Sequence, residues 1–208
     1  ATIAAASAIE SQGRTDTSFP NWGHEVSGRA AARISILDGA RPMVRVALLG
    51  DQGLGFRSRA VLELVREAGV DFAVILGDFD YTDSPQAWSE QLAALGQVPW
   101  LAVVGNHDVA KWKHYQRLIA EGHRGLRDAH CSGSPGSQEV CTYHGVTLVL
   151  SGIGTLGLRA EHEAFINSAL SENSGTWKLC LWHKNQHDMQ LGKKADEVGW
   201  TVYKACQG

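Results

Sequence analysis

Three apolar runs, each followed by glycine and then by a polar side chain, constrain the fold of this chain more than its other features do. The polar side chains are Asp51, Asp78 and Asn106, and they are 27 and 28 positions apart. This separation is close to the length of one strand–helix–strand unit, about 30 residues. Continuous apolar strands that alternate with helices favour an α/β fold in which both faces of the sheet are covered. We therefore expect the three polar side chains to lie side by side beyond the carboxyl ends of parallel strands.

The other expected elements follow from apolar periodicity and from turn and capping signals. Asp38-Gly39 predicts a hairpin turn between the first two strands. Ser84 and Pro85 predict the start of a helix, as its N-cap and its first residue. We expect strands at 33–37, 43–49, 72–76, 100–104, 146–150 and 178–182, and helices at about 58–68, 84–95, 111–121, 160–170 and 195–206.

Length and composition favour one globular domain. The chain has 208 residues, of which 44% are hydrophobic. Residues 1–30 lack clear periodicity, so we expect them to be an extension packed on a single domain of residues 31–208. The net charge of −3 provides no basic field for nucleic acid, and no apolar run has the length of a membrane span. The chain begins at Ala1 without a positively charged leader, which is compatible with a mature N-terminus left by cleavage.

The four cysteines are Cys131, Cys141, Cys180 and Cys206. An even number permits two disulfides in three connectivities. Cys131 and Cys141 flank a loop-forming stretch, Ser132–Ser137, so they form the favoured bridge. Buried free thiols in a cytosolic protein are the alternative. We expect a secreted or extracytoplasmic protein.

The polar side chains at the strand ends form a pattern that suits metal binding. The strand at 178–182 ends at His183, Tyr81 follows Asp78, and His107 follows Asn106. Crowded carboxylates repel one another unless a positive group lies among them. Oxygen and nitrogen ligands of this kind suit metals of intermediate hardness. Two such ions about 3.5–4 Å apart, bridged by a carboxylate, could clamp a phosphate and generate hydroxide at neutral pH.

Each of these residues also has a purely structural interpretation. A single Gly-Asp after a strand is commonly a turn or a helix N-cap. His183 alone could be a hydrogen-bonded histidine, and Tyr81 could cover the edge of the sheet. The occurrence of three glycine-led acidic or amide ends in order, together with a histidine, favours a functional site.

The motifs themselves resemble those of the calcineurin-like metallophosphoesterases. The resemblance is carried by Gly50-Asp-Gln-Gly53, Gly77-Asp-Phe-Asp-Tyr81, Gly105-Asn-His-Asp108 and a strand that ends in His183. Tyr81, and the lack of a histidine two positions after Asp51, make the chain similar to the purple acid phosphatase branch. The resemblance covers residues 41–208 and implies a sandwich of two mixed β-sheets flanked by helices.

The resemblance also implies roles for the site residues. Asp51 and Tyr81 would bind the first metal, which is typically ferric iron in that branch, and Asp78 would bridge both metals. Asn106 and His183 would bind the second, typically iron, zinc or manganese. His107 would contact the phosphate and act as the catalytic acid for the leaving oxygen, while a metal-bound hydroxide attacks phosphorus.

One motif of that family, a Gly-His-x-His segment after the helix that follows the His183 strand, does not occur here. We therefore expect a domain that is incomplete at its C-terminal end, in a chain that is a fragment of a longer protein. Each metal would then lack one imidazole. His187 is a candidate substrate contact, because it lies four positions beyond His183.

Three hypotheses for the function follow. The first is a binuclear metal-dependent phosphoester hydrolase, that is, a phosphatase or phosphodiesterase of the acid phosphatase type, with a phosphoester substrate. The alternative is a catalytically impaired or non-catalytic phosphoesterase-like fragment that acts as a structural unit and self-associates through an exposed sheet edge. The third is a flavodoxin-like or nucleotide-binding domain. Against it, Gly50–Gly55 places an aspartate where a phosphate would be repelled.

Overall fold

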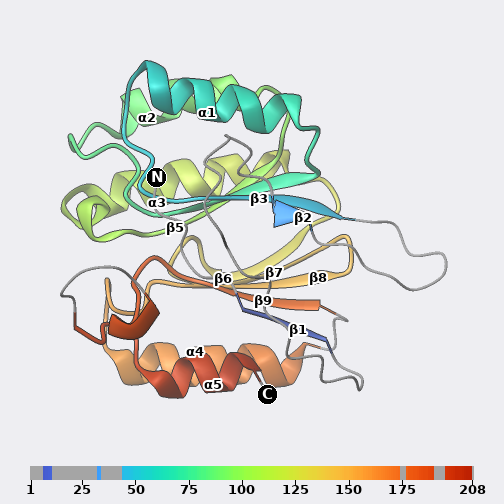
Figure 1. Ribbon diagram of the computed structural model, residues 1–208, viewed down its shortest axis with the longest axis vertical. Coiled ribbons are helices and arrows are strands. Elements are labelled where there is room, and N and C mark those ends of the chain that lie inside the picture. The colour runs from blue at the N-terminus through green and yellow to red at the C-terminus, as the bar shows by residue number, and fades with distance from the viewer. Residues whose placement is uncertain (1–6, 11–31, 34–43, 174–176, 190–194, 208) are drawn as a thin grey trace.

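The apolar runs of the sequence become strands of two β-sheets that lie face to face, with helices on the outer face of each (Figure 1). The computed structural model of the chain describes residues 7–10, 32–33, 44–173, 177–189 and 195–207. This mixed α/β sandwich confirms the fold class that the motifs predicted.

The first sheet has the order β2-β3-β4-β5 and supplies three of the predicted site residues. Its strands are β2 (Ala32–Arg33), β3 (Arg45–Leu49), β4 (Phe72–Leu76) and β5 (Trp100–Val103). Strands β3, β4 and β5 are parallel, so their carboxyl ends lie at one edge, as the spacing predicted. Strand β2 is antiparallel to β3, as expected for the first two strands, but the predicted Asp38-Gly39 turn lies outside the described residues.

The second sheet has the order β1-β9-β8-β7-β6. Its strands are β1 (Ser7–Glu10), β6 (His130–Ser134), β7 (Gln138–Tyr143), β8 (Val146–Ser151) and β9 (Trp177–Leu181). Strands β8 and β9 are parallel, and the other pairs are antiparallel. The predicted loop at 132–137 is confirmed only for residues 135–137, which form the turn between β6 and β7, whereas residues 132–134 belong to β6. All of β6 is exposed, so its sequence carries no apolar alternation that could have indicated a strand.

Three helices, α1, α2 and α3, cover the first sheet, and α4 and α5 cover the second (Figure 1). The predicted helix at 195–206 begins later than expected, because Gly199 has a φ of 101°. The side-chain oxygen of Gln186 accepts the N–H groups of Val198 and Gly199 just before the helix starts. The bounds are α1 Phe56–Glu67, α2 Pro85–Leu92, α3 Trp112–Gly122, α4 Arg159–Glu172 and α5 Trp200–Gln207. Short 3-10 helices are η1 Ala93–Leu95, η2 Asn106–Lys111, η3 His123–Gly125 and η4 His187–Met189.

Buried apolar side chains form three layers, and β4 shows why its sequence is apolar throughout. Phe72, Val74 and Leu76 pack between the two sheets. Ala73 and Ile75, on the opposite face of the strand, pack under the helices that cover the first sheet. Alternate residues of a strand point to opposite faces, so a strand covered on both faces must be apolar at every position.

Two disulfides are present, Cys131–Cys141 and Cys180–Cys206. The first confirms the favoured bridge and joins directly paired residues of β6 and β7. The second ties α5 to β9.

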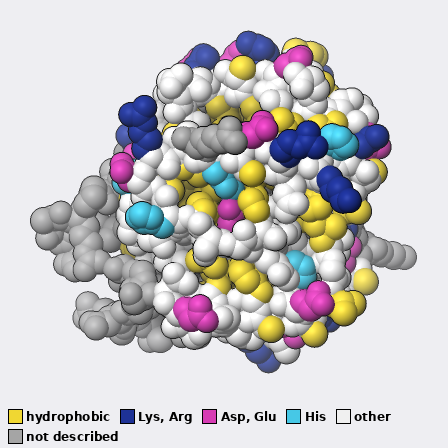
Figure 2. Space-filling model, turned by 180° about the vertical axis from the view of Figure 1, so that it is seen from behind, with side chains coloured by type: hydrophobic (Ala, Val, Ile, Leu, Met, Phe, Trp, Pro, Cys, Tyr) yellow, Lys and Arg dark blue, Asp and Glu magenta, His cyan; other side chains and the backbone are white. Residues whose placement is uncertain are grey.

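Within the described ranges, no helix combines the length and the apolar character that a bilayer span requires. On the face shown in Figure 2, acidic side chains lie among the basic ones of the upper part, so the described residues there form no continuous basic surface.

His162 on α4 gives the fold a specific sensitivity to acid. Its side chain is only 2% exposed, its Nε2–H donates to the Leu156 carbonyl (2.7 Å), and its Nδ1 accepts from the Ser151 hydroxyl (3.0 Å). Burial lowers the pKa of His162 below its ordinary value of 6.5. His162 is therefore protonated in the unfolded chain at a pH at which it is still neutral in the folded chain. The free energy of unfolding falls as the pH drops below about 6.5.

We expect His162→Gln, which keeps a donor and an acceptor but does not titrate, to flatten this dependence. The slope of the free energy of unfolding below about pH 6.5 should decrease by up to about 1.4 kcal/mol per pH unit. Urea denaturation at several pH values would measure it. His130→Gln, at an exposed position on β6, is the matched control. Parallel pH profiles for the wild type and His162→Gln would contradict the assignment.

Candidate metal centre

The loops after β3 and β4 hold two carboxylates in an unusual backbone conformation. Asp51 and Asp78 have φ values of 51° and 56°, in the left-handed region that costs free energy for residues other than glycine. The N–H of Asp51 donates to the Gly77 carbonyl (3.1 Å), and the N–H of Gln52 donates to the Asp78 carbonyl (2.9 Å). These bonds tie the two loops together, so the conformation of each carboxylate is fixed by its neighbour.

Two glycines allow the chain to pass close to these carboxylates. A Cβ atom on Gly105 would lie 2.1 Å from the Asp78 nitrogen and 2.3 Å from its Oδ1. A Cβ atom on Gly77 would lie 2.5 Å from the Gly105 Cα. Gly77 and Gly105 are therefore required by the close approach of two backbones, in addition to the turns that their loops make.

Asp108 holds the closely spaced backbones of Asp78 and Gly105 in place. It is 1% exposed, and its carboxylate accepts the N–H groups of Asp78 (2.9 Å), Phe79 (2.9 Å) and Gly105 (2.7 Å). Burial raises the pKa of the Asp108 carboxyl to about 7, although the three N–H donors act to lower it. Asp108 was recognised in the sequence only as part of the Gly-Asn-His-Asp motif. Its positioning role could not be read from the sequence, because the bonded groups lie 29 and 30 positions away or inside its own turn.

His183 reaches the same place from the second sheet, after β9. Its Nδ1 lies 2.7 Å from the Leu76 carbonyl oxygen. A carbonyl can only accept, so Nδ1 carries the proton, and in a neutral ring Nε2 presents its lone pair. That Nε2 faces two oxygens, Oδ1 of Asn106 at 3.1 Å and Oδ1 of Asp78 at 3.4 Å. A lone pair facing two acceptor oxygens is repulsive unless a proton or a cation lies between them.

Tyr81 and His107 lie at the open side of the cluster. The Tyr81 hydroxyl donates to Oδ1 of Asp51 (3.0 Å), and burial and this bond raise the pKa of the phenol. The rings of Tyr81 and His107 pack edge to face with 4.9 Å between their centroids. The backbone N–H of His107 donates to Oδ1 of Asp78 (3.0 Å), so the main chain of His107 is tied to this carboxylate.

Asp80, the second carboxylate of the Gly-Asp-Phe-Asp-Tyr motif, points elsewhere. It is 2% exposed and accepts from the N–H groups of Thr82 and Ser84 and from the hydroxyl of Tyr115. These bonds fix the loop that leads into α2, which is a structural role.

His187 stays a prediction as a substrate contact. It lies exposed in η4, and its backbone N–H donates to Asp196 (3.0 Å). It is not part of the group of close donor atoms that contains His183. The neighbouring Lys184 forms an ion pair with Glu197 at 2.9 Å.

The donor atoms of this cluster are close enough to share metal ions. Single ligand atoms of Asp51, Asp78 and His183 all lie within 4.8 Å of one another. The hydroxyl of Tyr81 contacts Asp51, and the amide oxygen of Asn106 contacts His183. The fold thus brings together all five residues that the family resemblance implied as ligands, and their oxygen and imidazole donors suit divalent or trivalent ions.

Comparison with known proteins identifies the family. Residues 44–203 match the family described as calcineurin-like phosphoesterase. The chain belongs to the calcineurin-like phosphoesterase family. The matched range confirms the family resemblance and includes every residue of the candidate metal centre. No curated protein matches the chain. Calcineurin-like phosphoesterases typically bind two metal ions and hydrolyse phosphoester bonds, so the family supports a metal-dependent hydrolase.

Proposed function

We propose that the chain hydrolyses phosphoesters at a binuclear metal centre in the manner of purple acid phosphatases. The observation that carries the proposal is the contact of His183 Nε2 with two oxygens while Nδ1–H is committed to the Leu76 carbonyl. This arrangement orients the imidazole as metal ligands are commonly oriented, through a backbone carbonyl on the other ring nitrogen. Strained backbone at Asp51 and Asp78 adds support, because such conformations concentrate at functional sites.

The contacts divide the ligands into two sets. Asp51 and Tyr81, which share a hydrogen bond, would bind the first metal. Asn106 and His183 would bind the second, and Oδ1 of Asn106 lies 3.1 Å from Nε2 of His183. The Asp78 carboxylate lies within reach of Asp51 and His183 alike and would bridge the two ions. Iron paired with iron, zinc or manganese fits a set of carboxylate, phenolate, amide and imidazole donors.

The chain's own residues then position the substrate and move a proton. Two bound metal ions would supply charge stabilisation for the phosphoryl group and lower the pKa of water that serves as the nucleophile. Asp108 keeps the Asp78 loop and the Gly105 turn in register. His107, packed against Tyr81, contacts the phosphoester and gives a proton to the leaving oxygen.

Two disulfides support a further part of the proposal, that the protein is secreted or extracytoplasmic. Disulfides persist in oxidising compartments and are rare in the cytosol.

Metal removal tests the proposed chemistry directly. Protein treated with a chelator should lose hydrolysis of an aryl phosphate and regain it when iron, zinc or manganese is added back. Elemental analysis of the active protein should find about two ions per chain. Turnover that survives complete metal removal, or protein that binds none of these ions, would overturn the proposal.

His107→Gln should lower kcat by about 10²–10⁴-fold, because it removes the proposed proton donor. Metal content should not change, since His107 is not among the proposed ligands and its backbone N–H to Asp78 is retained. The loss should be larger for an alkyl phosphate than for a nitrophenyl phosphate, whose leaving oxygen needs less protonation. His114→Gln, an exposed histidine on α3, is the control. An equal loss for both substrates would contradict proton donation.

A further inference from the structure

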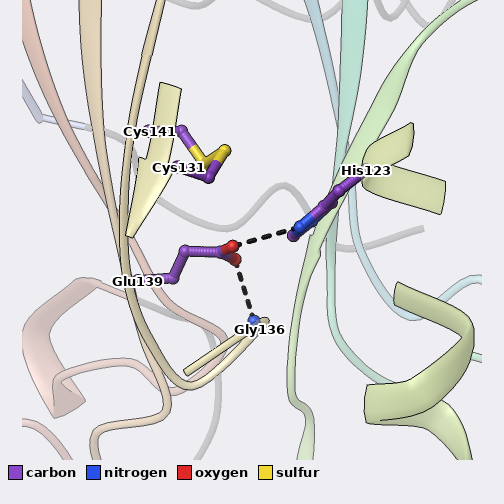
Figure 3. The surroundings of a disulfide bond; sticks show 5 residues. All are labelled: His123, Cys131, Gly136, Glu139 and Cys141. Atoms are coloured by element: carbon purple, nitrogen blue, oxygen red, sulfur yellow. Dashed lines mark hydrogen bonds and ion pairs between the residues drawn. A yellow bond between two sulfur atoms is a disulfide. The ribbon is translucent and has the colours of Figure 1, made fainter. Parts of the chain in front are cut away.

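A second cluster of side chains of types that can ligate a metal lies at the β6–β7 hairpin, built by elements that the proposed metal centre does not use. Figure 3 shows it: His123 from η3 faces Glu139 of β7, and the disulfide Cys131–Cys141 lies beside them. His123, Cys131 and Glu139 line a cavity of about 330 Å³. Ligand atoms of His123, Cys131 and Glu139 all lie within 4.8 Å of one another.

The polar groups in this cavity are only partly satisfied. Glu139 is 2% exposed; one carboxylate oxygen accepts the Gly136 N–H (3.0 Å), and the other lies 3.2 Å from His123 Nδ1. The His123 side chain is 14% exposed, and its Nε2 is buried without a hydrogen-bond partner among the described residues. A buried ring nitrogen without a partner is rare in folded proteins, and a bound ion is one of the arrangements that explains it.

The oxidation state of Cys131 decides what this cavity can bind. In a disulfide its sulfur carries no charge and is a poor ligand, whereas a thiolate is a strong ligand for zinc. Cys131 is exposed, whereas the two sulfur-bearing residues of the other bridge, Cys180 and Cys206, are 1% and 0% exposed. A reductant in solution therefore reaches the Cys131–Cys141 bridge first.

We propose that reduction of the Cys131–Cys141 disulfide opens a zinc site formed by the Cys131 thiolate, His123 and Glu139. A dithiol reductant supplies two electrons and two protons, so the protein gains two thiols and the reductant becomes a disulfide. Zinc then displaces the proton of the Cys131 thiol, which passes to solvent. Sulfur, imidazole and carboxylate are the three ligand types that Zn²⁺ takes in proteins, and water completes a set of four.

Cobalt(II) is the probe for this site, because a thiolate bound to cobalt gives a charge-transfer band in the near ultraviolet. The ligands of the proposed binuclear centre contain no sulfur, so cobalt bound there does not produce this band. Cys141→Ser frees Cys131 without any reductant and leaves Cys180–Cys206 intact. We expect this variant to bind one more equivalent of cobalt than the wild type and to show the band.

Cys131→Ser is the matched control, because it breaks the same disulfide and frees one thiol at Cys141, which is fully buried and is not part of the close group. It should show no band. Adding His123→Ala to Cys141→Ser should weaken cobalt binding roughly tenfold or more. A band of equal strength in Cys131→Ser, or no band in folded Cys141→Ser, would overturn the proposal.

Wild-type protein provides the second measurement if Cys141→Ser does not fold, as judged by circular dichroism. A phosphine reductant should produce the band in the wild type, and alkylation of the Cys131 thiol after reduction, but before cobalt is added, should abolish it. Failure of this band would leave the phosphoesterase proposal intact, because the two sites share no ligand. A reduced wild type without the band would equally overturn the zinc site.

Discussion

Asp78→Asn is expected to lower kcat for phosphoester hydrolysis by roughly 10²–10⁴-fold. The substitution removes the charge that bridges the two proposed metals, and several kcal/mol of transition-state stabilisation depend on those ions. Asparagine also tolerates the left-handed backbone of this position better than most residues, so the φ of 56° is retained. The loss should therefore come from metal binding, which elemental analysis of the purified variant would measure.

Asp128→Asn is the matched control for this experiment. Asp128 also has a positive φ, 68°, but it is exposed and lies outside the cluster. The control should keep its activity and its metal content. If Asp78→Asn kept two metals and its turnover, the bridging role of Asp78 would be wrong.

Gly105→Ala is expected to destabilise the protein and to lower its activity strongly, although it adds only one methyl group. The φ of Gly105 is −105°, which any residue can adopt, so the penalty is steric rather than conformational. The added Cβ would lie 2.1 Å from the Asp78 nitrogen and would push apart the loops that hold the site. Overpacking of this kind costs about 3 kcal/mol or more. Chemical denaturation would measure the loss of stability, and activity should fall with it.

Gly125→Ala serves as the control, because a Cβ atom at Gly125 meets nothing within 4 Å. This variant should unfold within about 0.5 kcal/mol of the wild type. A Gly105→Ala protein with wild-type stability and full activity would show that the loops at Asp78 and Gly105 can separate without cost.

The part of the fold that sequence reasoning predicted is the part with strong local signals. Strands β3, β4 and β5 are apolar on both faces, and their spacing predicted that Asp51, Asp78 and Asn106 would meet. The parts that it missed depend on partners far along the chain or on weak patterns. Strand β1 exists through pairing with β9, and β6 is exposed and rich in glycine and serine.

The same distinction holds for the site. Glycine-led strand ends drew attention to Asp51, Asp78 and Asn106, and the family resemblance implied the ligand roles of these residues and of Tyr81 and His183. The tautomer of His183 did not follow from the sequence, because it is set by the Leu76 carbonyl, 107 positions away. The pairing of His123 with Glu139 was missed for a similar reason, since it requires η3 and β7 to be adjacent.

His183 is the one member of the cluster that comes from the second sheet, while Asp51, Asp78 and Asn106 come from the first. An ion shared by both groups would therefore be a cross-link between the two layers of the sandwich. An ion that binds only the folded chain adds about 2.7 kcal/mol to stability when it is present at 100 times its Kd. The melting temperature would then rise with the metal concentration and would report how much of the centre is occupied. In the metal-free protein, we expect unfolding to begin with the separation of the two sheets.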